Sequence, residues 1–320
     1  MKHLFIVNPV AGHHDRTAEM REKVPPLFGS PEQYEIYTTS APGDGEAKVR
    51  REALSGQELR IYAVGGDGTL NECVNGAYGC PNAAVTLYPG GTGNDFVRMF
   101  GPEKQRLYDL GELVNGEVRR LDLIECCGRL GVNICSVGID ARVGTQVHEY
   151  SRLPLLGGSA AYICSAVVNF CRGVGQPMSV SFGDESLSGS VALVCACNGR
   201  YYGGGWCPVP EARPDDGVLD FLVVRNAGRA KLLTLIPRYA SGKYRQIPEK
   251  YISHYRGTEL RISSPEELCV NVDGERLSAC ELSFRLIPAA VNFIFPRDME
   301  FFKFNSQKYG DILRKSNISL

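Results

Sequence analysis

The turn at residues 65–69 reads Gly-Gly-Asp-Gly-Thr, and it joins an apolar run at 59–64 to a helix-like run that begins at Leu70. Three glycines let the backbone approach an anion closely, and the following helix directs free N–H groups and a positive dipole end toward it. A bare carboxylate repels phosphate unless a metal ion or a proton lies between them. Asp67 therefore favours metal-assisted phosphate chemistry, and a plain strand-to-helix connection is an equally good interpretation of the turn alone.

The turn differs from the common nucleotide-binding motifs. It lacks the Gly-Lys-Ser/Thr ending of a P-loop, and it misses the third glycine of a dinucleotide-binding fingerprint. Its function must therefore be inferred together with other parts of the chain.

Composition limits the class of protein. The chain has 320 residues, 43% of them hydrophobic, which is enough for a sizeable core and most simply for two domains. Lys and Arg number 35 against 36 Asp and Glu, so we expect no nucleic-acid partner bound through bulk charge. Residues 1–9 hold too few apolar residues for a secretory signal, and we expect a first strand there.

Twelve cysteines raise the question of a metal site or disulfides. They form no Cys-x-x-Cys pair, and no His-x-x-x-His pair lies near them. Buried free thiols in a reducing compartment are the simpler interpretation, and they indicate a cytoplasmic protein.

A stretch at 153–171 has no charged residue and is long enough to span a bilayer. Its prolines, glycines and polar residues lower its apolar density, so we expect a buried or amphipathic helix over 155–171. Contact of that helix with lipid is an alternative to core packing.

The first 125 residues alternate strand-like and helix-like patterns. Strands are expected at 3–8, 33–39, 59–64 and 83–88, and helices are expected to begin at Asp15, Gly43, Leu70 and Asn94. This order predicts a parallel sheet flanked by helices. Ligands of such sheets bind beyond the carboxyl ends of the strands, where Asn8, Thr39 and two glycine-rich turns lie.

After Arg119 strand-like runs separated by turns dominate, and they predict a mainly antiparallel β-sandwich. The strands are expected at 121–126, 132–137, 178–182, 190–198, 218–224, 259–262, 269–272 and 282–295, with a helix at 230–241. Residues from 297 to 320 are expected to form a tail.

Three more turns carry carboxylates. A second glycine-rich turn at 90–94 precedes Asp95, and two turns in the second half read Asp-Asp-Gly at 215–217 and Asp-Gly-Glu at 273–275. For each of the last two turns alone an ordinary hairpin is the better interpretation, because Asp-Gly is a favoured turn pair.

Taken together, these motifs resemble the soluble diacylglycerol kinase-like lipid kinases, which are related to sphingosine kinases and more distantly to NAD kinases. The resemblance runs from Asn8-Pro9 to the Asp-Gly-Glu turn at 273–275, and so covers nearly the whole chain. It implies an α/β ATP-binding domain at 1–125, NAD kinase-like in fold, and a lipid-binding β-sandwich at 126–296. The tail at 297–320 could pack back on the first domain.

The resemblance also implies the cofactors ATP and Mg²⁺ and a set of site residues. Nucleotide contacts would fall on Asn8, Thr39, Gly65, Gly66, Asp67, Gly68, Thr69, Leu70, Asn71, Gly91, Thr92 and Asn94. A structural magnesium site would use the Asp216 carboxylate and the backbone carbonyls of Arg213 and Val218.

The catalytic residues implied are three carboxylates. Glu275 would accept the proton, with Asp273 beside it as the other candidate, and Asp67 would organise the catalytic Mg²⁺ through water. Asp95 and Asp122 are candidates to extend this acidic network.

The chain departs from the family in its first loop, where related sequences have a second glycine and a lysine. Here residues 13–16 read His-His-Asp-Arg. Arg16 is a candidate for the missing cation, and a solvated helix start capped by Asp15 is the alternative.

Three functions are consistent with this sequence. The leading one is an ATP-dependent lipid kinase that phosphorylates diacylglycerol to phosphatidic acid. We expect such an enzyme to contact the inner membrane surface transiently, without a spanning helix. The others are an NAD kinase-like enzyme and a non-catalytic lipid- or nucleotide-binding regulator. The sequence leaves open which lipid is the acceptor and whether the protein forms a homodimer.

Overall fold

The computed structural model describes residues 1–12, 14–139 and 174–303. The predicted helix at 155–171 and most of the predicted tail lie outside the described residues.

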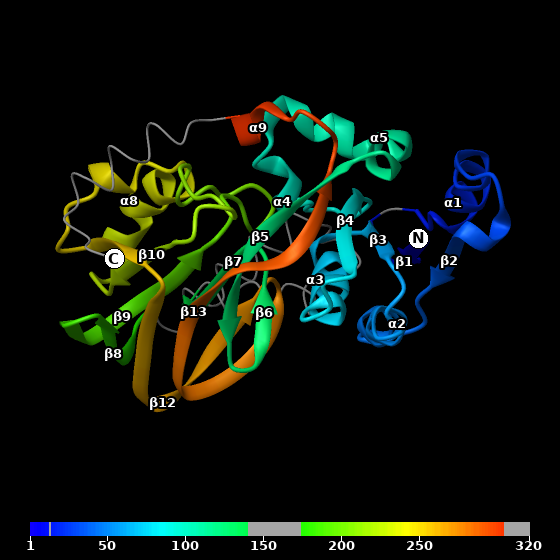
Figure 1. Ribbon diagram of the computed structural model, residues 1–320. Helices are drawn as coiled ribbons and strands as arrows, with labels where there is room; N and C mark the ends of the chain where they lie inside the picture. The colour runs from blue at the N-terminus through cyan, green and yellow to red at the C-terminus, as the bar shows by residue number, and fades with distance from the viewer. Residues whose placement is uncertain (13, 140–173, 304–320) are drawn as a thin grey trace.

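The N-terminal part is a four-stranded parallel sheet with helices packed against it (Figure 1). Its strands, in the spatial order β4-β3-β1-β2, are β1 (Lys2–Val7), β2 (Tyr34–Thr38), β3 (Leu59–Gly65) and β4 (Ala83–Pro89). The helices that follow the first three strands are α1 (Thr17–Lys23), α2 (Asp44–Ala53) and α3 (Asp67–Ala77). The predicted α/β order is confirmed, with strand ends shifted by one or two residues.

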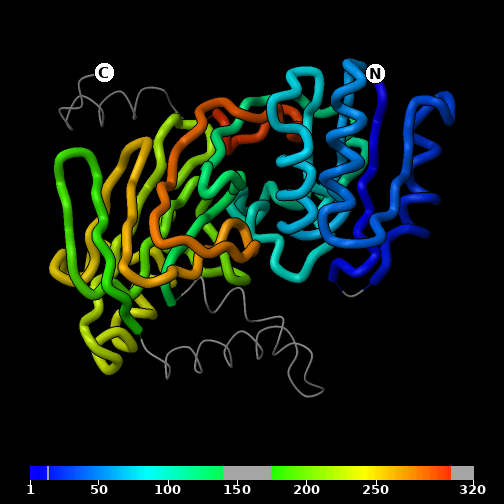
Figure 2. Tube along the Cα trace, turned by 90° about the horizontal axis from the view of Figure 1, so that it is seen from below, coloured from blue at the N-terminus to red at the C-terminus, as the bar shows by residue number. Residues whose placement is uncertain are grey.

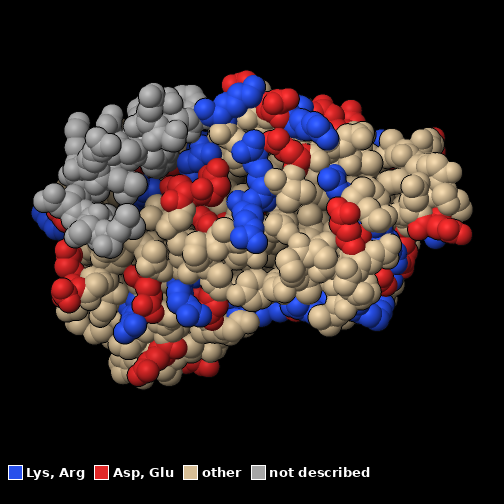
Figure 3. Space-filling model, in the orientation of Figure 1, with Lys and Arg blue, Asp and Glu red and all other residues tan. Residues whose placement is uncertain are grey.

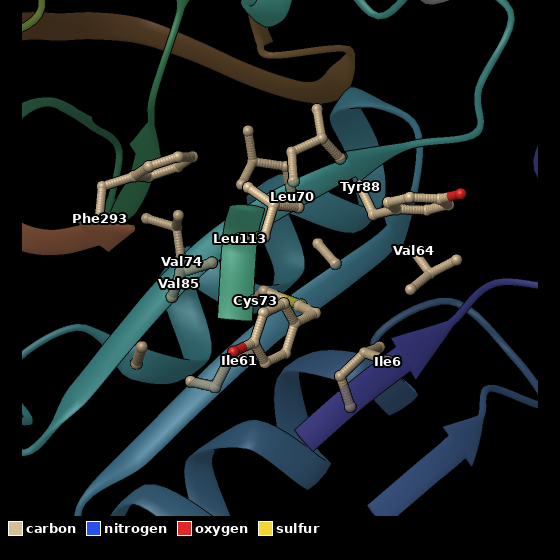
Figure 4. Close-up of a cluster of buried hydrophobic side chains, with 14 of the residues drawn as sticks. Ile6, Ile61, Val64, Leu70, Cys73, Val74, Val85, Tyr88, Leu113 and Phe293 are labelled. Atoms are coloured by element: carbon tan, nitrogen blue, oxygen red, sulfur yellow. The ribbon is translucent and has the colours of Figure 1, made fainter. Parts of the chain in front are cut away.

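Strands β3 and β4 are apolar along almost their whole length because both faces of the sheet are covered. Figure 4 shows side chains from β1, β3, α3 and β4 meeting in one cluster, which also receives Leu113 and Phe293 from later in the chain. Those two residues lie on α5 (Leu110–Val114) and β13 (Glu275–Phe295). The core of the first part is therefore completed by side chains of α5 and β13.

The remaining strands pair mainly antiparallel, as predicted. They are β5 (Glu117–Cys126), β6 (Arg129–Gly131), β7 (Ile134–Gly138), β8 (Gln176–Phe182), β9 (Glu185–Cys197), β10 (Leu219–Arg225), β11 (Ile252–Gly257), β12 (Glu259–Val272) and β13. The further helices described are α4 (Asp95–Arg98), α8 (Arg229–Ala240) and α9 (Glu300–Lys303), with 3₁₀ turns at Pro25–Leu27, Pro31–Gln33, Gly101–Tyr108 and Tyr244–Gln246.

Strand β13 belongs to both halves of the molecule. Its first part pairs with β12, its last part pairs in parallel with β4, and β5 runs antiparallel beside it (Figures 1 and 2). Leu282 and Phe284 lie in the sandwich core, whereas Phe293 and Phe295 lie in the core under the parallel sheet. The predicted end of the first domain at residue 125 falls inside β5, and the predicted end of the second at residue 296 directly follows β13. These domain limits stay a prediction.

The second half differs from the predicted strands in several places. Strands β5, β9 and β13 begin at Glu117, Glu185 and Glu275, four to seven residues before the predicted starts. The runs at 259–262 and 269–272 form one strand, β12, whose pairing with β13 is interrupted between Ser263 and Leu268. Strands β6 and β11 were not predicted, because β6 has three residues and β11 reads Ile-Ser-His-Tyr-Arg-Gly. Such short or polar strands show little hydrophobic alternation.

The cysteines of the described residues are free thiols, and most of them are buried. Within residues 1–12, 14–139 and 174–303, no helix has the length and apolar character that crossing a membrane requires.

We predict that Phe293→Ala lowers the free energy of unfolding by about 3–5 kcal/mol, because the ring is fully buried between Phe96 and Phe295. Urea denaturation measures the loss. Leu233→Ala is the control, since that side chain is 55% exposed on α8 and its removal should cost no more than about 0.5 kcal/mol. Equal effects of the two substitutions would show that β13 does not complete the first core.

Candidate functional site

Three glycine-containing turns pack backbone against backbone at the carboxyl ends of β1, β3 and β4. A Cβ at Gly91 would lie 2.5 Å from the Cα of Gly66, and a Cβ at Gly12 would lie 2.1 Å from the carbonyl oxygen of Gly90. The Gly90 N–H donates to the Gly65 carbonyl at 2.7 Å. Since side chains are excluded from these contacts, the turns present backbone to a ligand, which suits the phosphates of a nucleotide.

Asn8 and Asn94 hold these turns in shape. The Asn8 amide donates to the Thr69 hydroxyl at 3.2 Å, which ties the loop after β1 to the turn after β3. Asn94 has a left-handed backbone, with φ of 49°, and its side chain exchanges two hydrogen bonds with the backbone of Gly91. The exposed Thr92 lies inside this second turn.

Some of the residues predicted to contact the nucleotide are already engaged within the protein. The N–H of Leu70 is the first to close the α3 ladder, bonding to the Gly66 carbonyl, and its side chain is buried. Gly68 is exposed at the start of α3, where helix N–H groups lack intrahelical partners. Thr39 lies before the start of α2, where the Glu72 carboxylate accepts hydrogen bonds from Gly43 and Gly45.

Asp67 caps the short helix α4. Its two carboxylate oxygens accept the N–H groups of Asp95 and Phe96 at 3.0 and 3.1 Å. Burial raises the pKa of Asp67, and these two hydrogen bonds oppose the rise. With both oxygens engaged, Asp67 fits a magnesium ion through an intervening water rather than by direct coordination.

Asp95 is a second buried carboxylate, and it lies between Asp67 and the loop at Gly204. Its carboxylate accepts the N–H of Gly204 at 2.7 Å and forms an ion pair with Arg98 at 3.0 Å. Burial, and next the nearby Asp67 carboxylate, raise the pKa of Asp95 to about 6. The loop at Gly204 is thereby attached to the second glycine-rich turn.

Asp273 joins the sandwich to α3. One oxygen accepts the Asn71 amide at 3.1 Å and the N–H of Val132 at 2.5 Å, and the other accepts the N–H groups of Asn133 and Ile134, both at 3.1 Å. Burial raises its pKa to about 6, although these donors favour the charged form. Asn71 therefore acts as a connector between the two halves rather than as a free nucleotide contact.

Glu275, the predicted proton acceptor, lies at the start of β13. Its two oxygens receive Nε and Nη2 of Arg129 at 3.1 and 3.2 Å, and Nη1 of the same arginine binds Glu46 of α2 at 2.9 Å. The Glu275 side chain is 39% exposed, so its carboxylate is accessible where that of Asp273 is not.

Asp216, the predicted metal ligand, belongs to a separate group of charges. One oxygen binds Nη2 of Arg256 at 2.8 Å, and the other accepts the N–H of Val218 at 3.3 Å. Burial raises its pKa to about 6, and Arg256 opposes the rise. A cation could use the Asp216 oxygen and the carbonyls of Arg213 and Val218 only by sharing the carboxylate with Arg256, so this site fits Mg²⁺ in part.

The Arg213 side chain points to other partners, because it makes two bonds to Asp215 and lies over the ring of Phe301. Asp122 holds the same loop by accepting the N–H of Gly217 at 2.8 Å. Among the described residues, no group of three or more His, Cys, Asp or Glu side chains could hold a metal ion.

Arg16, the candidate to replace the lysine absent from the first loop, lies beside Gly90. Its side chain crosses Gly90, so that a Cβ there would be 3.1 Å from Nε, and its guanidinium lies 5.4 Å from the centre of the Tyr88 ring. An ion pair with Glu19 at 3.6 Å is loose. The guanidinium is therefore beside the glycine-rich turns.

Sequence reasoning missed Arg129, Glu46 and Arg256. The one local signal in the sequence is the glycine directly before Arg129. In the structure Cys127 and Gly128 have φ of 51° and 78°. Positive φ at both central residues is typical of a two-residue hairpin turn, and it marks Arg129 as the first residue of the returning strand.

Family models match both halves of the chain. The diacylglycerol kinase catalytic domain matches residues 2–126, and the YegS C-terminal NAD kinase β-sandwich-like domain matches residues 133–295. The chain belongs to the diacylglycerol kinase-like lipid kinase family that these two domains define.

Individual relatives agree with this assignment. The chain is 31% identical over 255 residues to a probable YegS-like lipid kinase of Pseudomonas aeruginosa, covering 79% of this chain and 82% of that one. A crystal structure of a diacylglycerol kinase from Bacillus anthracis is 23% identical and superposes with a TM-score of 0.67 over 93% of this chain and 98% of that one. Another structure from the same strain is 24% identical, with a TM-score of 0.71 over 92% and 97% of the two chains. At sequence identities below 25%, the similarity to these two structures establishes the fold alone.

We predict that Asp95 makes stability fall as the pH rises. The folded protein holds the Asp95 proton more tightly than the unfolded chain does, so this contribution is complete below about pH 4 and is lost as the pH passes about 6. Asp95→Asn should therefore gain stability relative to the wild type over this interval, by roughly 3 kcal/mol at most. Urea unfolding between pH 4 and 7.5 measures the difference, and a difference that is constant with pH would contradict the prediction.

Proposed function

We propose that the protein is an ATP-dependent, Mg²⁺-requiring lipid kinase that transfers the γ-phosphate to the hydroxyl of diacylglycerol, giving phosphatidic acid. The observation that carries this proposal is the bond between Asn71 and Asp273. It joins the glycine-rich turns to the hairpin that bears Glu275, so an anion cradle and an accessible carboxylate lie on one connected unit. Phosphoryl transfer requires these two elements together with charge neutralisation.

The nucleotide would be held mainly by backbone. The turns at 65–69 and 91–94 supply N–H groups and the Thr92 hydroxyl for the phosphates, and Arg16 supplies a positive charge next to Gly90. Thr39 lies at the neighbouring strand end, before α2. When bound, Mg²⁺ would neutralise phosphate charge during transfer, with Asp67 holding one of its waters.

Glu275 would accept the proton. As the lipid oxygen forms a bond to the γ-phosphorus, its proton passes to the Glu275 carboxylate, and the bond from phosphorus to the bridging oxygen breaks so that ADP leaves with the electron pair. Asp273 is poorly suited to this role, because four donors already occupy its oxygens. Its hydrogen bonds favour a structural role instead.

The partners follow from this chemistry and are part of the proposal. The acceptor lipid lies in a bilayer, so the protein would act in the cytoplasm through transient contact with the inner membrane surface. Figure 3 shows Lys and Arg interspersed with Asp and Glu over one face, and the formal net charge is −1. This mixture counts against a nucleic-acid partner, which requires a basic surface.

The test is incubation with radiolabelled ATP and Mg²⁺ against diacylglycerol, ceramide, sphingosine, phosphatidylglycerol and NAD in parallel. We expect label in diacylglycerol. Glu275→Gln should lower the rate roughly 10²- to 10⁴-fold because the proton acceptor is lost. Glu281→Gln, an exposed residue on the same strand, is the matched control and should leave the rate unchanged.

The other outcomes separate the alternatives. Label in NAD alone would establish an NAD kinase-like enzyme, and label in another lipid alone would correct the acceptor. Absence of transfer to every acceptor would favour a non-catalytic regulator.

A further inference from the structure

Strand β6 is fixed between the two halves of the molecule. The Leu130 carbonyl accepts the Asn71 and Asn75 amides at 2.7 and 3.0 Å, and the Leu130 N–H donates to Asn75 at 3.2 Å. Two residues later, the N–H of Val132 donates to Asp273. Polar side chains of α3 therefore hold Leu130, and the turn before β13 holds the residue that follows the strand. Figure 1 shows β6 beside β5, with which it pairs.

The turn before β6 is fixed as well. The N–H of Gly128 donates to the Glu125 carboxylate at 3.0 Å, and Cys126 pairs with Arg129 across the hairpin. The backbone of Arg129 is thus determined on both sides. An arginine on such a strand loses less freedom when its guanidinium binds than one on a mobile loop.

The guanidinium of Arg129 lies between two carboxylates from different halves. It binds both oxygens of Glu275 and both oxygens of Glu46, with N–O distances from 2.9 to 3.2 Å. This planar, two-sided geometry is specific to arginine, because a lysine ammonium is a point charge. Without Arg129 the two carboxylates would repel each other, and Glu275 would be free to take other rotamers.

Glu46 also connects this contact to the nucleotide side. It lies in the first turn of α2, whose start is bound by Glu72 of α3. Helices α2 and α3, strand β6 and the start of β13 are thereby joined by hydrogen bonds or ion pairs.

We propose that Arg129 is a positioning residue that holds the Glu275 carboxylate in the orientation in which it accepts the proton of the lipid hydroxyl, with Glu46 as its anchor on α2. This inference rests on the proposed function, in which Glu275 is the proton acceptor. Arg129 acts through Glu275 rather than on the substrates.

The test compares steady-state kinetics of four substitutions in the full chain, with ATP and diacylglycerol. Arg129→Met should lower kcat by about 10²-fold, since misplacement of a catalytic group by 1 Å can cost that much, while KM for both substrates changes little. Arg129→Lys should recover part of the loss, and Glu46→Gln should cost less, because Glu275 keeps its own pair. Arg261→Met removes a similar two-bond pair with Glu259 from an exposed face of β12 and should have no effect.

The double variant Arg129→Met/Glu275→Gln distinguishes positioning from general stabilisation. If Arg129 acts through Glu275, the double variant is no slower than Glu275→Gln alone. The proposal would be overturned if the fold-losses in kcat of the two single variants multiplied in the double variant. It would also be overturned if Arg129→Met changed only KM or only the urea midpoint. A wild-type protein that transfers no phosphate would refute the proposed function itself, whereas an active wild type with unchanged kcat in Arg129→Met refutes only the positioning role.

Discussion

The carboxylate of Asp273 links the turn before β13 to helix α3 of the N-terminal part. It accepts one side-chain and three backbone hydrogen bonds, and its own residue adopts a left-handed backbone with φ of 49°. A buried charge is costly, but four donors to one carboxylate compensate for much of that cost. The strand that holds Arg129 and the turn that precedes Glu275 both take their places from this interaction.

The proposed anion cradle, at the carboxyl ends of β1, β3 and β4, is built almost without side chains. Gly66, Gly90 and Gly91 touch through backbone atoms, and Gly12 closes on them from the first loop. Asp67 contributes by capping α4, so its carboxylate shapes the cradle as well as lending it charge. A substitution at these glycines would change the cradle through steric displacement, even where it left every charge in place.

Much of this arrangement could be predicted from the sequence, because local patterns determine it. The alternation of apolar strands with helices in residues 1–125 predicted the parallel sheet. The glycines of the Gly-Gly-Asp-Gly-Thr turn predicted a close backbone packing, and anion binding there stays a prediction. Glu275, Asp273 and Asp216 were chosen because their turns matched the family motifs, since each turn alone is better explained as an ordinary hairpin. Family resemblance supplied their expected roles.

The contacts of those residues could not be predicted in the same way. Arg129 lies 83 residues from Glu46 and 146 residues from Glu275 along the chain, and it is one of 35 basic residues. Arg256 reaches Asp216 from β11, a strand too polar to show alternation. Such ion pairs depend on how separate elements pack in the folded protein, with Arg256 on β11 beside β10 and Arg129 on β6 beside β5.

The length of β13 has a mechanical consequence. Its 21 residues pass from the sandwich core into the core beneath the parallel sheet, and β5 lies against it over much of that distance. A two-stranded ribbon that is packed at both ends resists bending far more than a flexible linker does. Any change in the angle between the two lobes must therefore bend this ribbon, and the register shift between Ile287 and Val291 marks the place where its pairing is already interrupted.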